Sequence, residues 1–183
     1  GTVQTATLVD ATGTGEGDDY AVIITGTHAS NAYIFNGGSI DIAPFGSAAS
    51  TALTTTVGPR ATVRFGAGCT PATINVYGGS LITYCAISAL LKFPSNAGGS
   101  ALLYGTGAVA QLTAFSGSID YRTTGTLGGT TLLGGSARLS FDGDQRAKTV
   151  TNQILIESPD ASVSDANKVI TGGHVEDWVN CVP

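Results

Sequence analysis

The stretch GGSLITYCAISALLKFPSNAGGSALL, residues 78–103, decides the fold of this chain. It contains two copies of one pattern, in which a Gly-Gly-Ser turn precedes a short strand of alternating character. Variants of this pattern begin at residues 37, 116 and 134. The interval from 37 to 78 is close to twice the others, and Gly58-Pro59-Arg60 stands where the intervening copy is expected. The chain therefore repeats with a period of about 18 to 20 residues over its central part.

This repeat predicts an all-β fold, a parallel β-helix with rungs of about 18–20 residues. Apolar strands also precede the turns, so each repeat runs from a strand through a tight Gly/Ser corner into a second strand. Glycine suits such a corner because it enters conformations with positive φ without a Cβ clash. An antiparallel β-sandwich or jelly roll with Gly-rich hairpins is the alternative, since Gly-Gly between two strands is also a hairpin signal. The even spacing favours the β-helix.

The composition excludes several classes of protein. The chain has 183 residues, a formal net charge of -5 and only 11% charged residues, against about 25% in ordinary soluble domains. With 42% hydrophobic residues it is too apolar for a disordered tail. Its acidity argues against nucleic acid as a partner. No apolar run approaches the roughly 20 residues of a membrane span, so no membrane partner is expected.

The charges divide the chain into three segments. Residues 61–140 carry only five charged residues, whereas acidic residues gather on both sides of this segment. Solenoids need capping segments, because their end rungs otherwise expose core and strand edges. We therefore expect an N-terminal arm or cap at 1–30, a β-solenoid body at 31–141 and a C-terminal cap or arm at 142–183. A weak capping-box pattern, Ser162-x-x-Asp165, suggests a short helix near Ser162 to Val169.

The acidic clusters indicate loops and not catalytic or ligand-binding sites. The stretch 13–19, GTGEGDD, precedes a predicted strand, whereas a dinucleotide-binding loop must open a helix, so we expect a flexible loop, with calcium binding as the alternative. Asp142 and Asp144 flank a glycine in a turn. Asp41 and Asp120 follow corners at the same phase of the repeat, about four rungs or about 19 Å apart. That exceeds the roughly 5 to 9.5 Å between the two carboxylates of a glycosidase.

No other residues form a recognisable site. The histidines are His28 and His174, and the fragment His174-Val175-Glu176-Asp177 lacks a third metal ligand. Cys69, Cys85 and Cys181 include no Cys-x-x-Cys pair, and we expect buried, inert thiols. A nucleophile elbow and a phosphate-binding loop are both missing. We therefore assign no catalytic, cofactor-binding or metal-ligating residues, expect no cofactor, and expect that the protein is not an enzyme.

Two surface features bear on partners. Six aromatic residues fall near predicted strand ends, where they serve either in core stacking or as an exposed face for a sugar or a protein; they are Tyr77, Tyr84, Phe93, Tyr104, Phe115 and Tyr121. The charge-poor middle segment is typical of a contact surface. We expect it to be buried in a homotrimer or on a virion lattice. The alternative is a Thr-rich surface that is simply solvated.

The Gly-Gly-Ser corners and Ala/Thr-rich rungs over residues 30–140 resemble bacteriophage virion proteins of β-helical type: capsid decoration (cement) proteins, tailspikes and tail-tip adhesins. The resemblance implies a noncatalytic structural protein that decorates a capsid, assembles in the host cytoplasm into the virion, and has the major capsid protein or another virion protein as partner. A carbohydrate-binding adhesin of the tail tip, whose partner is a cell-surface glycan, is the alternative. A small polysaccharide lyase or hydrolase is a weaker alternative, because no carboxylate groove is visible.

Overall fold

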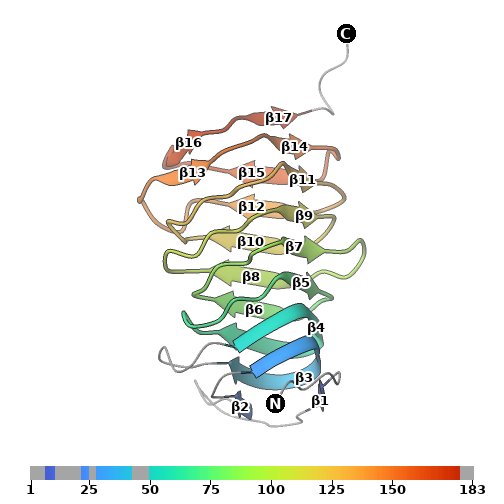
Figure 1. Ribbon diagram of the computed structural model, residues 1–183. Helices are drawn as coiled ribbons and strands as arrows, with labels where there is room; N and C mark the ends of the chain where they lie inside the picture. Colours follow the sequence, from blue (N-terminus) through green and yellow to red (C-terminus); the bar gives the residue numbers. More distant parts are fainter. Residues whose placement is uncertain (1–6, 11–21, 25–27, 43–49, 178–183) are drawn as a thin grey trace.

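The computed structural model describes residues 7–10, 22–24, 28–42 and 50–177, which form an all-β solenoid of about six turns (Figure 1). All strand pairs between these residues are parallel. The predicted parallel β-helix is therefore confirmed, and the antiparallel sandwich is excluded. A hairpin would have paired chain neighbours in antiparallel directions, whereas here the strands pair in parallel with strands of the neighbouring turns.

The first turns contain two long strands that each run around a corner. They are β3 (His28–Ile42) and β4 (Ser50–Phe65), which pair along almost their whole length. On the other side of β3, β1 (Thr7–Asp10) pairs with its first half and β2 (Val22–Ile24) with its second half. The register of β3 on β4 shifts between Phe35 and Gly37, where both strands turn the corner.

From β4 onward the turns present two broad faces. Face A begins with the second half of β4 and continues with β6 (Ser80–Thr83), β8 (Ser100–Leu103), β10 (Ser118–Tyr121), β12 (Arg138–Ser140) and β15 (Ser162–Ser164). Face B begins with the first half of β4 and continues with β5 (Thr73–Val76), β7 (Leu90–Phe93), β9 (Leu112–Ala114), β11 (Thr131–Leu133), β14 (Ile154–Ile156) and β17 (Val175–Asp177).

A narrow third side joins the end of face A to the start of face B. It consists of single parallel bridges that link Ile87, Val109, Leu127 and Val150, and of the pair β13 (Lys148–Val150) and β16 (Ile170–Gly172). The loops that flank these bridges differ in length from turn to turn. Stacked positions along face A recur at nearly even intervals from Val63 to Leu139, but the step from Leu139 to Val163 is longer. The predicted rung length thus describes the middle of the solenoid, and the last turns are larger.

The repeated Gly/Ser motifs are the corners between face B and face A. Gly78 and Gly117 adopt φ values of 88° and 82°, which favour glycine. Gly79 has no positive φ, but a Cβ on it would lie 2.2 Å from the carbonyl oxygen of Gly58 in the turn below. The corners therefore need glycine for two separate reasons: backbone conformation and the close approach of successive turns.

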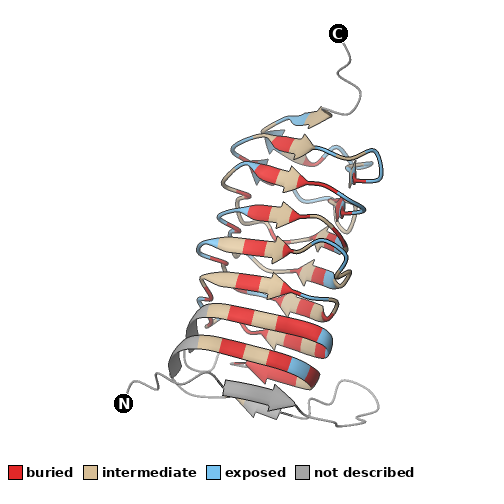
Figure 2. Ribbon diagram, turned by 90° about the vertical axis from the view of Figure 1, so that its right-hand side faces the viewer, coloured by how far each residue is buried: buried red, intermediate tan, exposed pale blue. Residues whose placement is uncertain are grey.

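The core fills the space between the two faces (Figure 2). Strands β5, β6 and β7 alternate between partly exposed and buried residues, as expected when successive side chains point to opposite sides of a sheet. Parallel register stacks the buried positions into columns, such as Val63, Leu81 and Ala101. Each large aliphatic side chain removed from water in such a column contributes about 1.5–3 kcal/mol.

The prediction of a short helix near Ser162 to Val169 is wrong. Ser162–Ser164 forms β15 on top of β12 instead. The Asp165 carboxylate accepts hydrogen bonds from the backbone N–H groups of Val169 and Ile170, at 2.8 and 3.2 Å, and so closes a turn between β15 and β16. Asp165, which the sequence analysis interpreted as part of a helix cap, therefore accepts hydrogen bonds from the backbone of a loop.

Within the segment 142–183, parallel strand pairing continues through β13 to β17 and ends at Asp177. The division into arm, body and cap stays a prediction, and residues 1–6 and 11–21 lie outside the described residues. The described ranges contain no helix long and apolar enough to cross a bilayer.

Candidate functional site

Face A carries three parallel rows of outward-pointing side chains on its middle turns. Because strand residues alternate, every second residue after a corner faces outward. The first row consists of the hydroxyl side chains of Thr62, Ser80, Ser100 and Ser118. The second row is aliphatic and ends in an acid: Ile82, Leu102 and Asp120. The third row is aromatic and ends in a base: Tyr84, Tyr104 and Arg122. We call these residues the three-row surface.

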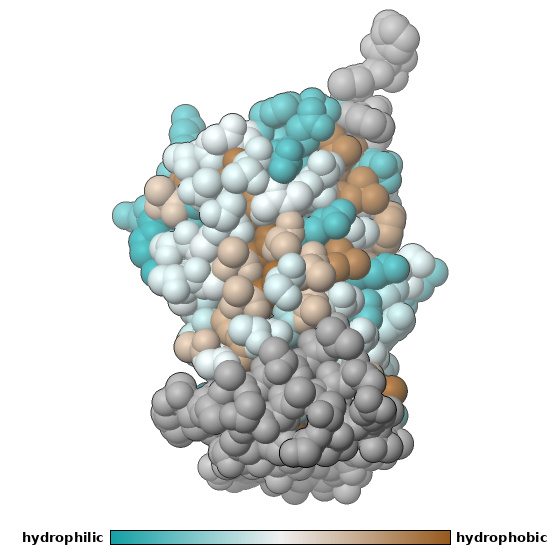
Figure 3. All heavy atoms as spheres, viewed as in Figure 1, coloured by the Kyte–Doolittle hydropathy of each residue, from teal (hydrophilic) through white to brown (hydrophobic). Residues whose placement is uncertain are grey.

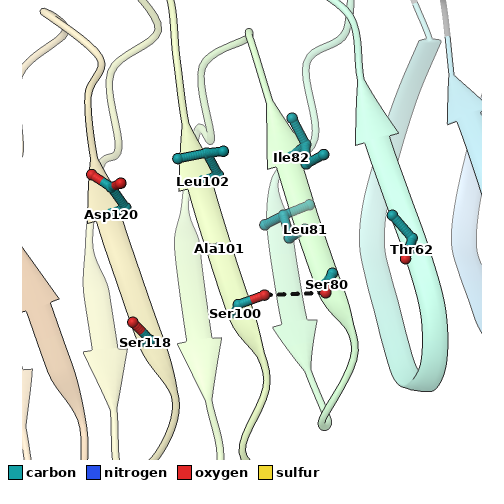
Figure 4. Close-up of a pocket in the computed structure, with 9 residues that line it drawn as sticks. All are labelled: Thr62, Ser80, Leu81, Ile82, Ser100, Ala101, Leu102, Ser118 and Asp120. Atoms are coloured by element: carbon teal, nitrogen blue, oxygen red, sulfur yellow. Dashed lines mark hydrogen bonds between the residues drawn. The ribbon is translucent and has the colours of Figure 1, made fainter. Parts of the chain in front are cut away.

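The first two rows line an open depression of about 410 Å³ (Figure 4). In this view Ser80, Ser100 and Ser118 point outward from neighbouring strands, and the hydroxyl of Ser100 donates a hydrogen bond to that of Ser80 at 3.1 Å. Ser100 and Ser118 are exposed. The depression therefore offers hydroxyl groups beside an aliphatic floor.

The third row is a short aromatic stack. The rings of Tyr84 and Tyr104 lie nearly parallel, with centroids 5.2 Å apart and an interplanar angle of 16°. Tyr84 is 40% exposed, which is unusual for so large a side chain. The guanidinium of Arg122 lies 5.8 Å from the centre of the Tyr104 ring and extends the stack by a cation–π contact.

An ion pair between Asp120 and Arg122 lies at the C-terminal end of the second and third rows. Arg122 Nε donates to Asp120 Oδ2 at 2.8 Å, and this hydrogen bond raises the pKa of Arg122. The other oxygen, Asp120 Oδ1, is buried and has no hydrogen-bond partner. Gly143 of the next turn leaves room for the pair, because a Cβ there would lie 2.5 Å from Asp120 Oδ1. The surface thus ends in a fixed carboxylate and a fixed cation.

The predicted common phase of Asp41 and Asp120 is confirmed, because Asp41, Arg64, Ile82, Leu102 and Asp120 follow one another in register. Asp41 is 2% exposed and forms an ion pair with Arg64 on the next turn. The two acids are four turns apart, or about 19 Å. The structure therefore does not bring them together as a catalytic pair.

Asp142 and Asp144 hold the loop between face A and the third side. Asp142 accepts hydrogen bonds from the Ser164 hydroxyl and the Ala166 N–H group. Asp144 accepts from Arg146 and from Lys148 Nζ, the latter at 2.7 Å, and the Lys148 side chain is fully buried. Desolvation alone would raise the pKa of Asp144, but these hydrogen bonds lower it to about 2. Both acids have structural partners.

The remaining sequence candidates do not converge on a site. His174 lies 2.6 Å from Glu176, which also accepts from Gln153. The described part of the chain contains no group of three His, Cys, Asp or Glu residues placed to hold a metal. Cys69 and Cys85 are buried, as expected. The loop 13–19, the side chain of His28 and Cys181 lie outside the described residues.

The six aromatic residues divide between buried and exposed positions. Phe93 and Tyr121 are fully buried, and Tyr77 and Tyr84 are exposed. The sequence analysis missed the three-row surface, although its signal is present. Aligning the repeats at their corners places Ser80, Ile82 and Tyr84 over Ser100, Leu102 and Tyr104.

Comparison with known proteins adds nothing to this geometry: no protein family, no curated protein and no solved structure matches the chain.

Proposed function

We propose that the protein is a noncatalytic attachment protein that binds a carbohydrate chain on the three-row surface. The observation that carries the proposal is the Tyr84–Tyr104 stack, in which Tyr84 is exposed and Tyr104 partly buried, beside a row of serine hydroxyls. Sugar rings present apolar C–H faces and a rim of hydroxyls. Aromatic rings pack against the first, and serine, aspartate and arginine side chains exchange hydrogen bonds with the second.

The acids of this surface support binding without cleavage. Glycosidases use two carboxylates about 5 to 9.5 Å apart. Asp120 is the acid that lines the depression, and Arg122 holds one of its oxygens in an ion pair. Asp41 lies four turns away in its own ion pair. Asp142 and Asp144, which flank Gly143 beside this pair, accept hydrogen bonds from Ser164, Arg146 and Lys148. A bound chain would therefore meet carboxylates that are held in structural contacts.

The test is a glycan array that includes bacterial surface polysaccharides, followed by affinity measurements on each glycan retained. Tyr84→Ala should weaken binding by about tenfold or more, because it removes half of the aromatic stack. Tyr77→Ala is the matched control: Tyr77 is 43% exposed, close to the value for Tyr84, but lies outside the three-row surface. Equal losses in both variants, or an array on which nothing binds, would refute the proposal.

A second candidate is capsid decoration in a virion, with the chain as a homotrimer bound to the major capsid protein or another virion protein. What supports it is the scarcity of charge between residues 61 and 140. Outward rows of face B are largely neutral, for example Thr54, Thr73 and Thr113. Figure 3 shows neutral to hydrophobic residues over the middle of one side of the molecule. Surfaces of this kind are tolerated where they pack against copies or a lattice.

The decoration proposal is tested by mixing the purified chain with capsids and measuring what sediments with them. Tyr84→Ala should leave capsid binding unchanged if the lattice contacts lie elsewhere on the solenoid. Because the same variant should weaken glycan binding, the two assays together separate attachment to sugar from attachment to a capsid.

A further inference from the structure

Two buried thiols lie against one another on successive turns of the solenoid. Cys69 follows β4 and is 2% exposed; Cys85 follows β6 and is 5% exposed. Their side chains form a hydrogen bond. Cys69 Sγ also donates to the carbonyl oxygen of Ile42 at 3.5 Å, and Cys85 Sγ lies 3.2 Å from Thr83 Oγ1. Each sulfur thus has a polar partner of its own in addition to its contact with the other thiol.

The chain between these cysteines is one complete turn. It runs through β5 on face B, around the Gly78-Gly79 corner, and back along β6 on face A. A bond between the two sulfurs would therefore close a covalent ring around the core. It would also fix the turn that contains β4 to the turn above it.

We propose that Cys69 and Cys85 form a disulfide while the chain folds, when a small-molecule disulfide is the oxidant. One thiolate attacks the oxidant, forms a mixed disulfide and releases the first thiol. The second cysteine then attacks the sulfur of its partner, releases the second thiol and completes the protein disulfide. Two electrons pass to the oxidant, and the two thiol protons pass to the released thiols.

The surroundings decide when the bond forms. The hydrogen bond with Cys69, followed by burial, raises the pKa of the Cys85 thiol above its ordinary value. Thiolates are the attacking species, so exchange within the folded solenoid is slow. The bond should therefore form while the chain folds, before these turns are covered, and should resist reduction afterwards.

The experiment refolds the denatured, reduced full chain in oxidised and reduced glutathione, then alkylates the free thiols and digests with trypsin without reduction. Cleavage after Arg64 and Lys92 leaves Cys69 and Cys85 in one peptide, whereas Cys181 lies in the C-terminal peptide. The expected product is peptide 65–92 without alkylation and lighter by two hydrogen atoms. A peptide 65–92 that carries two alkyl groups, or one joined to the C-terminal peptide, would overturn the proposal.

A second measurement does not depend on peptide mapping. In Cys181→Ser the urea midpoint should be higher after oxidative refolding than after refolding with a thiol reductant, because the ring restricts the unfolded chain. In the double variant Cys85→Ser/Cys181→Ser the two midpoints should coincide. An unchanged midpoint in Cys181→Ser would count against closure of the ring.

Discussion

At the scale of single residues, the corner glycines separate two requirements that often coincide. Gly79 sits where successive turns approach closely, and its φ is not positive. Gly98 has a φ of 68°, yet a Cβ on it would meet no atom within 4 Å. The same substitution at the two positions therefore probes contact at one corner and backbone conformation at the next.

Gly79→Ala should lower the free energy of unfolding by about 2–4 kcal/mol, because the added Cβ would lie 2.2 Å from the Gly58 carbonyl oxygen and force neighbouring turns apart. Gly98→Ala should cost about 1–2 kcal/mol, the strain of a left-handed residue. Urea unfolding of both variants measures the difference. A larger loss in Gly98→Ala would show that contact between turns does not set the requirement at Gly79.

Asp144 links a single residue to the pH dependence of stability. Its pKa in the folded state is about 2, below the ordinary value of 3.8, so folding favours the charged form. The resulting stabilisation is complete above about pH 4 and is lost as the pH falls towards 2. Asp144→Asn should flatten the stability profile in this window.

At pH 7 Asp144→Asn should cost about 2 kcal/mol, because the buried Lys148 loses its charged partner. Unfolding free energies of both proteins between pH 7 and pH 2 provide the measurement. Asp160→Asn, at an exposed position, controls for the loss of one negative charge. If the free energy of unfolding of both variants still falls with pH below pH 4 as steeply as that of the wild type, Asp144 is not the group responsible for the loss of stability.

At the scale of elements, single motifs predict the corners, whereas the outer surface can be predicted only by aligning the repeats with one another. Gly-Gly-Ser marks a corner by local backbone chemistry, so its spacing gives the turn length directly. The helix at 162–169 failed because Ser162 and Asp165 suit a strand end and a loop as well as a helix cap, and stacking on β12 decided between them. The three-row surface depends on the register of β6, β8 and β10, which the spacing gives but individual motifs do not.

The nearly equal lengths of the middle turns make an internal deletion testable. Removing residues 100–117 would join Gly99 to Ser118, so β10 would stack on β6 in the register that β8 now has. The shortened chain should fold with a similar β-sheet signal in circular dichroism and lower stability. Removing only 100–108 should prevent folding of the later turns, since face A and the third side would fall out of phase. A folded half-turn deletion would contradict the register argument.

At the scale of the whole molecule, the shortage of charge predicts association. If the charge-poor sides pack against one another, light scattering across a dilution series should give a stable mass near three times that of a single chain. Replacing outward neutral residues of face B, for example Thr73→Lys with Thr113→Lys, should dissociate the assembly if face B lies in the contact. The matching pair Ser100→Lys with Ser118→Lys tests face A. A monomer at all concentrations would contradict the predicted trimer and indicate that the neutral surface is solvated.

The parallel stacking of the turns also sets the order in which the molecule can be built. Each turn pairs with the one made just before it, so the emerging chain always finds a template already in place, as a crystal grows by adding layers. Every incomplete molecule therefore ends in an open strand edge, which a second incomplete molecule can occupy. A defect in an early turn would stop everything after it, whereas the same defect in the last turn would cost one layer. Tolerance to mutation should accordingly rise along the chain from β4 to β17.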